Sequence, residues 1–135
     1  MRRKRKPLTA VAGDHRRLAG SPDRQLHVTD PLDFEVDAGG HTTLEKHEHT
    51  HLVIPIKGKG SCLVDDEVLP LAIHDLVYVP AWAWHQFRAA ENEVLGFLCM
   101  VKVKRDRPTL PTPEELAQMK SNPEVAAFLR NQNFY

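Results

Sequence analysis

Histidines and acidic residues gather in one short stretch of the chain, in a pattern that can bind a metal ion. The stretch Glu45–His51 holds three histidines, and a fourth, His85, follows the aromatic segment Pro80–Trp84. Side chains of a strand alternate between its two faces, so positions 45, 47, 49 and 51 share a face until a bulge or turn intervenes. Imidazole and carboxylate ligands suit Fe, Mn, Zn, Ni or Cu. The pattern predicts a site for one divalent transition metal, and a polar outer strand face with incidental histidines is the weaker interpretation.

The elements that must position these side chains are short strands. Apolar runs alternate with turn residues between Leu26 and Val103, without a sustained helical period. Such a pattern is typical of an antiparallel sandwich or barrel. Turn residues at Gly58–Gly60, Asp65–Glu67 and Glu91–Asn92 predict three hairpins. The predicted strands are Leu26–Val28, Asp33–Val36, Leu44–His47, Leu52–Ile56, Ser61–Val64, Val68–Leu71, Leu76–Val79, Gln86–Ala89 and Val94–Val103.

Two segments resemble the paired motifs of the cupin superfamily. The first motif runs from glycine through His-x-His, three residues, Glu or His, six residues and glycine, and here it ends at Gly58. The second, Gly-Asp-x4-Pro-x-Gly-x2-His, corresponds to His74–His85, with His74 and Trp82 where the motif has glycine. The resemblance covers residues 32–103. It implies an all-β fold, a small antiparallel double-stranded β-helix or jelly-roll barrel.

The same resemblance implies a ligand set. Counting back from Gly58 places His51 at the position usually held by glutamate, His47 as the second histidine, and Glu45 in place of the first. With His85 from the second motif, the implied ligands are three nitrogens and one oxygen.

An alternative register pairs His47 with His49 as the His-x-His motif. It puts Val53, which cannot ligate, at the glutamate position. His49 is therefore kept as the alternative ligand to Glu45.

Strand parity also suggests what surrounds the metal. His85 and Phe87 share one parity, as do Phe97 and Cys99. We expect Phe87, Phe97 and Cys99, with Trp84, to line a small substrate pocket, although each is also an ordinary packing residue. Such a pocket is apolar and aromatic and suits a small, weakly polar substrate.

Local resemblances point to redox chemistry. The segment Pro80–His85 resembles gentisate-type ring-cleaving cupin dioxygenases, and His51 together with Phe97–Cys99 resembles small single-domain cupins with an all-histidine metal site. The leading hypothesis is a mononuclear non-haem metal dioxygenase or other oxidoreductase that acts on a small organic molecule. The alternatives are a non-catalytic cupin that senses or stores a metal or small ligand, and a metal-dependent isomerase or decarboxylase.

The chain divides into three parts. Residues 1–24 carry charge, proline and glycine without a hydrophobic period, which predicts a flexible basic leader. Residues 25–105 form the predicted barrel. In residues 106–135 a proline-rich connector leads to two short predicted helices, Pro113–Met119 and Pro123–Arg130, with Thr112 and Asn122 as N-caps. We therefore expect one barrel with a short C-terminal helical extension.

The composition is that of one globular domain. The chain has 135 residues, 41% hydrophobic and 27% charged, which excludes disordered and fibrous classes. No apolar run approaches the about 20 residues of a membrane helix, and two cysteines make no disulfide framework. We expect a cytoplasmic protein without a membrane partner. Basic residues concentrate in the leader, so we expect no nucleic-acid partner, and apolar edge strands predict a homodimer.

Overall fold

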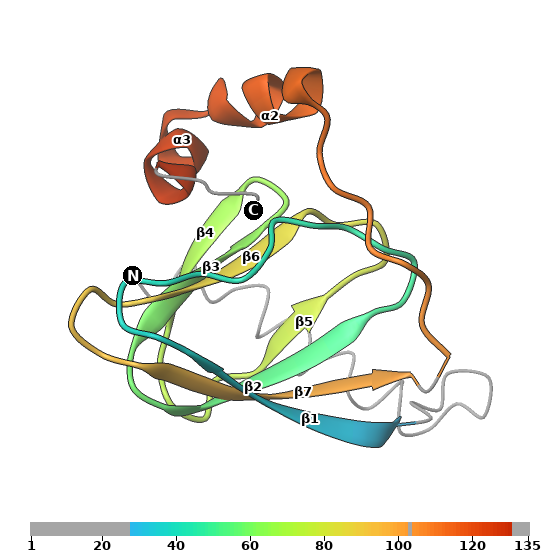
Figure 1. The fold of residues 1–135 in the computed structure, drawn as a ribbon, viewed down its shortest axis with the longest axis vertical. Coiled ribbons are helices and arrows are strands. Elements are labelled where there is room, and N and C mark those ends of the chain that lie inside the picture. The colour runs from blue at the N-terminus through green and yellow to red at the C-terminus, as the bar shows by residue number, and fades with distance from the viewer. Residues whose placement is uncertain (1–27, 103, 131–135) are drawn as a thin grey trace.

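The strands form two antiparallel sheets that face each other (Figure 1). The computed structural model describes residues 28–102 and 104–130. One sheet has the strand order β1-β7-β2-β5 and the other β4-β3-β6. This architecture confirms the predicted all-β jelly roll with C-terminal helices. The elements are β1 (Val28–Val36), β2 (His51–Lys57), β3 (Gly60–Val64), β4 (Glu67–Leu71), β5 (Val77–Val79), β6 (His85–Ala89), β7 (Leu95–Lys102), α2 (Pro113–Lys120) and α3 (Pro123–Leu129).

The predicted strand Leu44–His47 is wrong. This segment makes only two isolated bridges, between Glu45 and His85 and between Lys46 and Thr109. It passes from the edge of β6 to the connector beyond β7, so successive residues bond to different partners and no ladder forms. The two predicted strands at 26–28 and 33–36 belong to one strand, β1, as far as the described residues extend. The predicted leader, residues 1–24, lies outside the residues that the structure describes.

Two of the three predicted hairpins are wrong, because their turns join strands of opposite sheets. Only the turn at Asp65–Asp66 connects paired strands, β3 and β4. The turns after β2 and after β6 instead carry the chain from one sheet to the other. They pack tightly together: Gly58 has a φ of 74°, and a Cβ there would lie 1.7 Å from the carbonyl oxygen of Val94. A glycine is therefore required at the end of the first motif.

Most of the hydrophobic core lies between the two sheets. It includes Val53, Cys62 and Leu95, each fully buried, with Phe87 and Phe97 from the facing sheets. The inward faces of β2, β6 and β7 thus combine apolar packing with the residues that the sequence marked as functional.

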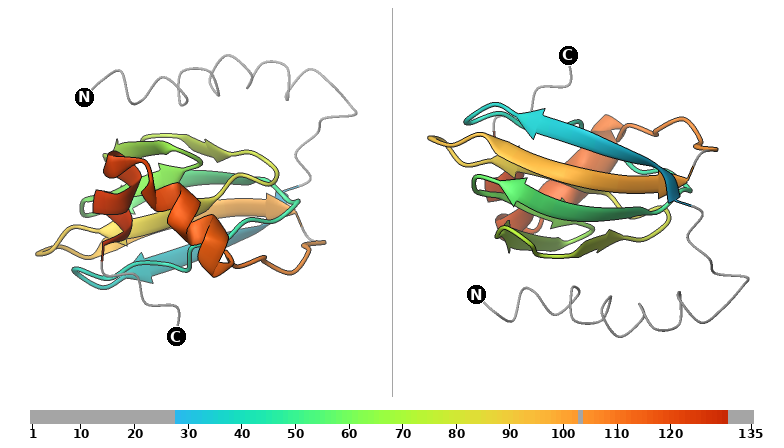
Figure 2. Two further views of the ribbon diagram at one scale, coloured as in Figure 1. Left: turned by 90° about the horizontal axis from the view of Figure 1, so that it is seen from above. Right: turned by 90° about the horizontal axis from the view of Figure 1, so that it is seen from below.

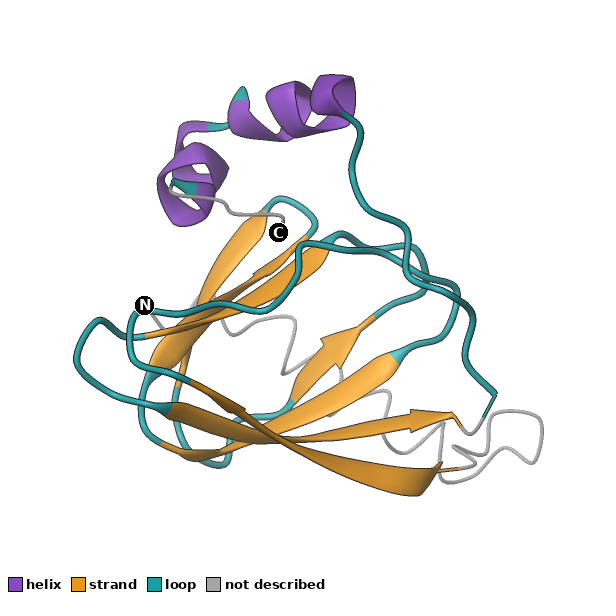
Figure 3. Ribbon diagram, viewed as in Figure 1, coloured by secondary structure: helices purple, strands orange, loops and turns teal. Residues whose placement is uncertain are grey.

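A second core holds the helices against the outside of β3 and β4 (Figures 2 and 3). The structure confirms both predicted helices and their caps: Thr112 accepts from the backbone of Glu115 in a capping box, and Asn122 caps α3. Leu44, Leu63, Val125, Phe128 and Leu129 make up this second core. Among the described residues no helix is long and apolar enough to cross a membrane.

We predict that Leu129→Ala lowers the free energy of unfolding by about 2–5 kcal/mol, the usual cost of emptying a packed leucine site. Leu129 is 0% exposed, whereas the control Leu110 is 47% exposed. Leu110→Ala is expected to change stability by no more than about 0.5 kcal/mol. Urea unfolding of both variants checks this. Equal effects of the two substitutions would show that α3 does not stabilise the barrel.

Candidate metal centre

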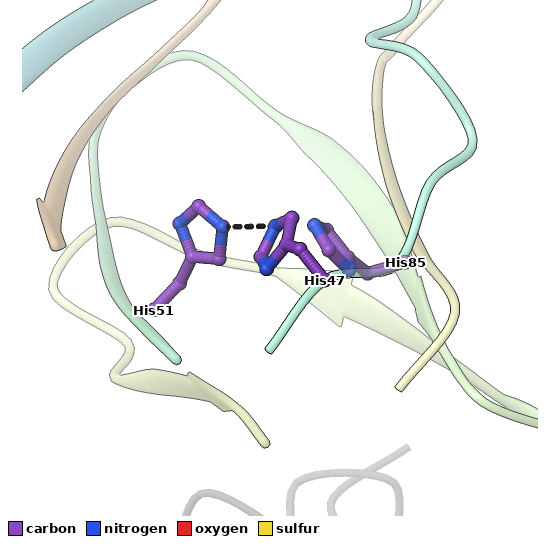
Figure 4. Close-up of side chains that lie close together, drawn as sticks. All are labelled: His47, His51 and His85. Atoms are coloured by element: carbon purple, nitrogen blue, oxygen red, sulfur yellow. Dashed lines mark hydrogen bonds between the residues drawn. The ribbon is translucent and has the colours of Figure 1, made fainter. Parts of the chain in front are cut away.

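Three of the histidines meet in the interior, between the two sheets (Figure 4). His51 begins β2, His85 begins β6, and His47 lies in the loop before β2. One ring nitrogen of each lies within 4.8 Å of the others, and Nε2 of His47 is 2.7 Å from Nε2 of His51. The fold therefore brings together three imidazoles from two distant parts of the chain.

Hydrogen bonds on the outer ring nitrogens orient these rings. Nδ1 of His47 donates to the carbonyl oxygen of His49 at 2.7 Å, and Nδ1 of His85 donates to that of Ala83 at 2.9 Å. A carbonyl only accepts, so the ring hydrogen must lie on Nδ1. Nε2 is then left with a lone pair directed inward, which is the form that binds a metal.

The third histidine has a sulfur partner. Nδ1 of His51 lies 2.7 Å from Sγ of Cys99. Burial raises the pKa of Cys99 to about 12, so this group is a neutral thiol near pH 7. Nε2 of His51 is hydrogen-bonded to Nε2 of His47 at 2.7 Å. Because the His47 hydrogen lies on its Nδ1, the hydrogen in this bond belongs to His51, and the Cys99 thiol donates to Nδ1 of His51.

Burial keeps the three rings neutral. Desolvation, reinforced by the neighbouring histidines, lowers the pKa of His51 to about 2 and that of His85 to about 4. Desolvation also lowers the pKa of His47. Metal ligation requires neutral imidazole, so the site already has its ligand form at neutral pH.

Glu45 lies at the edge of this group. Its Oε2 is 3.5 Å from Nε2 of His47, and its backbone forms the bridge with His85. Burial raises the pKa of Glu45, because desolvation disfavours the charged carboxylate. A bound cation would relieve that cost.

His49 is directed elsewhere. Its ring lies flat on that of His47, with centroids 3.6 Å apart and planes 3° apart. Its Nδ1 is 2.7 Å from Oδ1 of Asp106. His47, His49 and Asp106 also form a group that could hold an ion, and neither His47 nor His49 lines the cavity described next.

A cavity of about 380 Å³ opens beside the histidines. One wall is aromatic: the Phe87 and Phe97 rings are 4.9 Å apart, and Phe34 stacks on Phe97 at 5.5 Å. The opposite wall is polar, from the segment before the histidine cluster. The lining residues are Phe34, His41, Thr42, Thr43, Glu45, His51, His85, Phe87, Phe97 and Cys99.

The structure places Trp84 outside this cavity. It precedes β6 by one residue and thus has the opposite parity to His85. Trp84 lines a separate groove of about 360 Å³ beside α2, and Nζ of Lys46 lies 4.5 Å from the centre of its ring. The other three expected pocket residues do line the cavity.

Sequence reasoning missed Phe34, His41, Thr43 and Asp106. Period-two alternation backward from Glu45 could have found Thr43 and His41. Phe34 lines the cavity because β1 pairs with β7, which places it opposite Phe97. No local pattern marks Asp106.

The chain is similar to known cupin proteins. The family model for the Cupin domain matches residues 32–101. The 1-methylthio-D-xylulose 5-phosphate methylsulfurylase of Rhodospirillum rubrum is 53% identical over 96 residues, or 71% of this chain and 62% of that protein. The chain thus spans less than two thirds of the length of this curated relative.

Solved structures share the barrel. A cupin-2 domain from Rhodospirillum rubrum has 52% identity and a TM-score of 0.71, covering 72% of this chain and 66% of that one. A cupin 2 domain-containing protein from Halorhodospira halophila has 44% identity and a TM-score of 0.75, covering 82% and 77%. Since the family model also matches more than half of its residues, the chain belongs to the cupin family.

Proposed function

We propose that this cupin is an enzyme whose His47, His51 and His85, with Glu45, hold one divalent transition metal. The observation that carries the proposal is the convergence of three imidazoles, two buried and that of His51 half-buried, each with its Nδ1 engaged outward. Three nitrogens and one oxygen are a common donor set for Fe, Mn, Zn, Ni or Cu. When bound, such an ion polarises a substrate carbonyl as a Lewis acid.

The cavity supports a small, two-sided substrate. At about 380 Å³ it lies near the lower end of the ~300–1,000 Å³ range of ligand pockets. His41 and Thr43 can bond hydroxyl or carbonyl oxygens, while Phe87 and Phe97 suit an apolar or sulfur-containing group, because thioethers pack well on aromatic rings. We therefore propose a hydroxylated ketone with an alkylthio substituent. The name of the Rhodospirillum rubrum relative, a methylsulfurylase of a methylthio-ketose phosphate, supports this class.

The proposed reaction removes the alkylthio group from the carbon beside the carbonyl. The carbon–sulfur bond breaks with its electron pair left on carbon, which then takes up a proton. The alkylthio group passes to a small thiol as a mixed disulfide, and the thiol supplies the proton, so carbon is reduced and sulfur oxidised. His41 and Thr43 would hold the substrate oxygens, and Phe34, Phe87 and Phe97 would exclude water from the reacting carbon.

A dioxygenase is the second candidate. The aromatic wall suits an aromatic or enolisable substrate, and among the described lining residues there is no Lys or Arg to meet a phosphate group. This candidate predicts consumption of O2, which the first reaction does not need.

The predicted homodimer stays a proposal. β1 and β5 are the edges of the four-stranded sheet and leave backbone groups that a second copy can pair.

We predict that His47→Ala and His85→Ala each remove most bound metal. Loss of one of three nitrogen ligands leaves too few donors to hold the ion in competition with water. His49→Ala is expected to keep one ion per chain at saturating metal, since a ring nitrogen of His49 engages Asp106 and His49 is not in the group formed by His47, His51 and His85. The exposed His74 provides the control substitution. Elemental analysis decides; full loss of metal in His49→Ala would favour the alternative register.

We predict that metal affinity changes little between about pH 8 and about pH 6. The pKa values of His85 and His51, about 4 and about 2, lie below this window, so no proton competes with the ion there. An imidazole of ordinary pKa, ~6.5, would instead cost roughly fourfold in affinity over the same window. Titration in a non-coordinating buffer measures it. A loss of metal affinity close to the product of three such fourfold factors would contradict the argument that burial keeps the rings neutral.

We predict that the metal-loaded protein releases the alkylthio group of a 1-methylthio-ketose phosphate anaerobically when a small thiol is present. The ketose lacking the thioether is the matched control, and the mixed disulfide is detected by mass spectrometry. Carbon–sulfur cleavage that requires O2 would contradict this reaction and favour the dioxygenase. Oxygen uptake with enolisable substrates, without carbon–sulfur cleavage, would do the same.

A further inference from the structure

Asp106 ties the segment after β7 to the loop that carries His47. Its Oδ2 accepts a hydrogen bond from the backbone N–H of Glu48 at 2.8 Å, and its Oδ1 accepts one from the backbone N–H of His49 at 3.0 Å. The same Oδ1 lies 2.7 Å from Nδ1 of His49. One carboxylate thus holds both the backbone and the ring of His49.

His49 in turn constrains His47 in two ways. The two rings are stacked face to face, with centroids 3.6 Å apart, and the carbonyl oxygen of His49 accepts the Nδ1 hydrogen of His47 at 2.7 Å. Both side chains are buried, with 1% of His47 and 7% of His49 exposed. A shift of His49 would therefore alter the contacts that determine where Nε2 of His47 points.

We infer that Asp106 is a positioning residue of the metal centre, which acts through His49 to orient His47. The inference rests on the proposed metal site. Asp106 lies beyond residues 32–101, which the family model matches, so the barrel motifs do not include it. Paired backbone hydrogen bonds between Lys46 and Thr109, at 3.0 and 2.7 Å, hold the connector beside the same loop. The connector therefore supports the metal-binding loop as well as linking the barrel to α2.

The chemistry of the carboxylate suits this role. Its two oxygens accept from three donors, and its negative charge strengthens each bond. In Asp106→Asn one acceptor oxygen remains, so part of the network survives, whereas Asp106→Ala leaves none. A positioning role thus predicts a graded effect across the series Asp, Asn, Ala.

Cobalt(II) binding to the full chain tests the inference. Its visible spectrum reports ligand geometry, and chelator competition gives the Kd. We expect Asp106→Ala to weaken binding by about 10–100-fold, the usual effect of removing a group that supports a ligand, and to shift the spectrum while keeping one ion per chain. Asp106→Asn should fall between Asp106→Ala and the native protein. In the control Asp75→Ala, which removes a carboxylate that accepts from the backbone of Ala72 at 2.9 Å, Kd and spectrum should be unchanged.

The outcomes separate this inference from the proposed function. If the native protein binds cobalt but Asp106→Ala and Asp106→Asn share its Kd and spectrum, the positioning role is overturned and the metal centre stands. If the native protein binds two ions and Asp106→Ala loses one, Asp106 is itself a ligand and the inference is equally overturned. A native protein that binds no cobalt overturns both proposals.

Discussion

Three neutral imidazoles share one space between the sheets, and the inward nitrogens of His47 and His85 carry lone pairs. His47 and His85 are fixed in this state because carbonyl oxygens hold their Nδ1 hydrogens. The 2.7 Å hydrogen bond between the Nε2 atoms of His47 and His51 therefore uses a hydrogen of His51. A divalent ion would take the place of this hydrogen among the three rings, and the same ion would relieve the raised pKa of Glu45.

The packing of the barrel directly determines how the three histidines are placed. Two ligands are the first residues of β2 and β6, which belong to different sheets, so the packing of the sheets determines how far apart the ligands lie. The bridge between Glu45 and His85 fixes the third segment along the edge of β6. Leu44, immediately before Glu45, is buried under α3, so the second core anchors the polar wall of the cavity from behind.

The sequence predicts the parts of this arrangement that depend on spacing along the chain. The resemblance to the cupin motif ending at Gly58 and the period of a strand predict the histidines, Phe87 and Phe97, which the structure brings close together. Errors arise where long-range pairing decides. Leu44–His47 forms no strand because its neighbours change at every residue, and the turns after β2 and β6 cross between sheets because the jelly-roll topology requires it.

The contacts that support the site could not be predicted from the sequence for the same reason. Asp106 reaches the histidine loop only because the connector folds back along Lys46, and Phe34 reaches the cavity only because β1 adds to the edge of β7. Neither contact has a sequence period. The prediction that Trp84 lines the cavity is wrong because adjacent residues of a strand point to opposite faces. Trp84, next to His85, therefore faces the outer groove.

X-ray absorption spectroscopy of the zinc-loaded protein tests the central claim most directly. The account predicts three imidazole nitrogens at about 2.0–2.1 Å and at least one oxygen in the same shell. It predicts no sulfur at about 2.3 Å, because the Cys99 thiol contacts the outer nitrogen of His51. A zinc–sulfur shell, or fewer than three imidazoles, would contradict the assignment of the site.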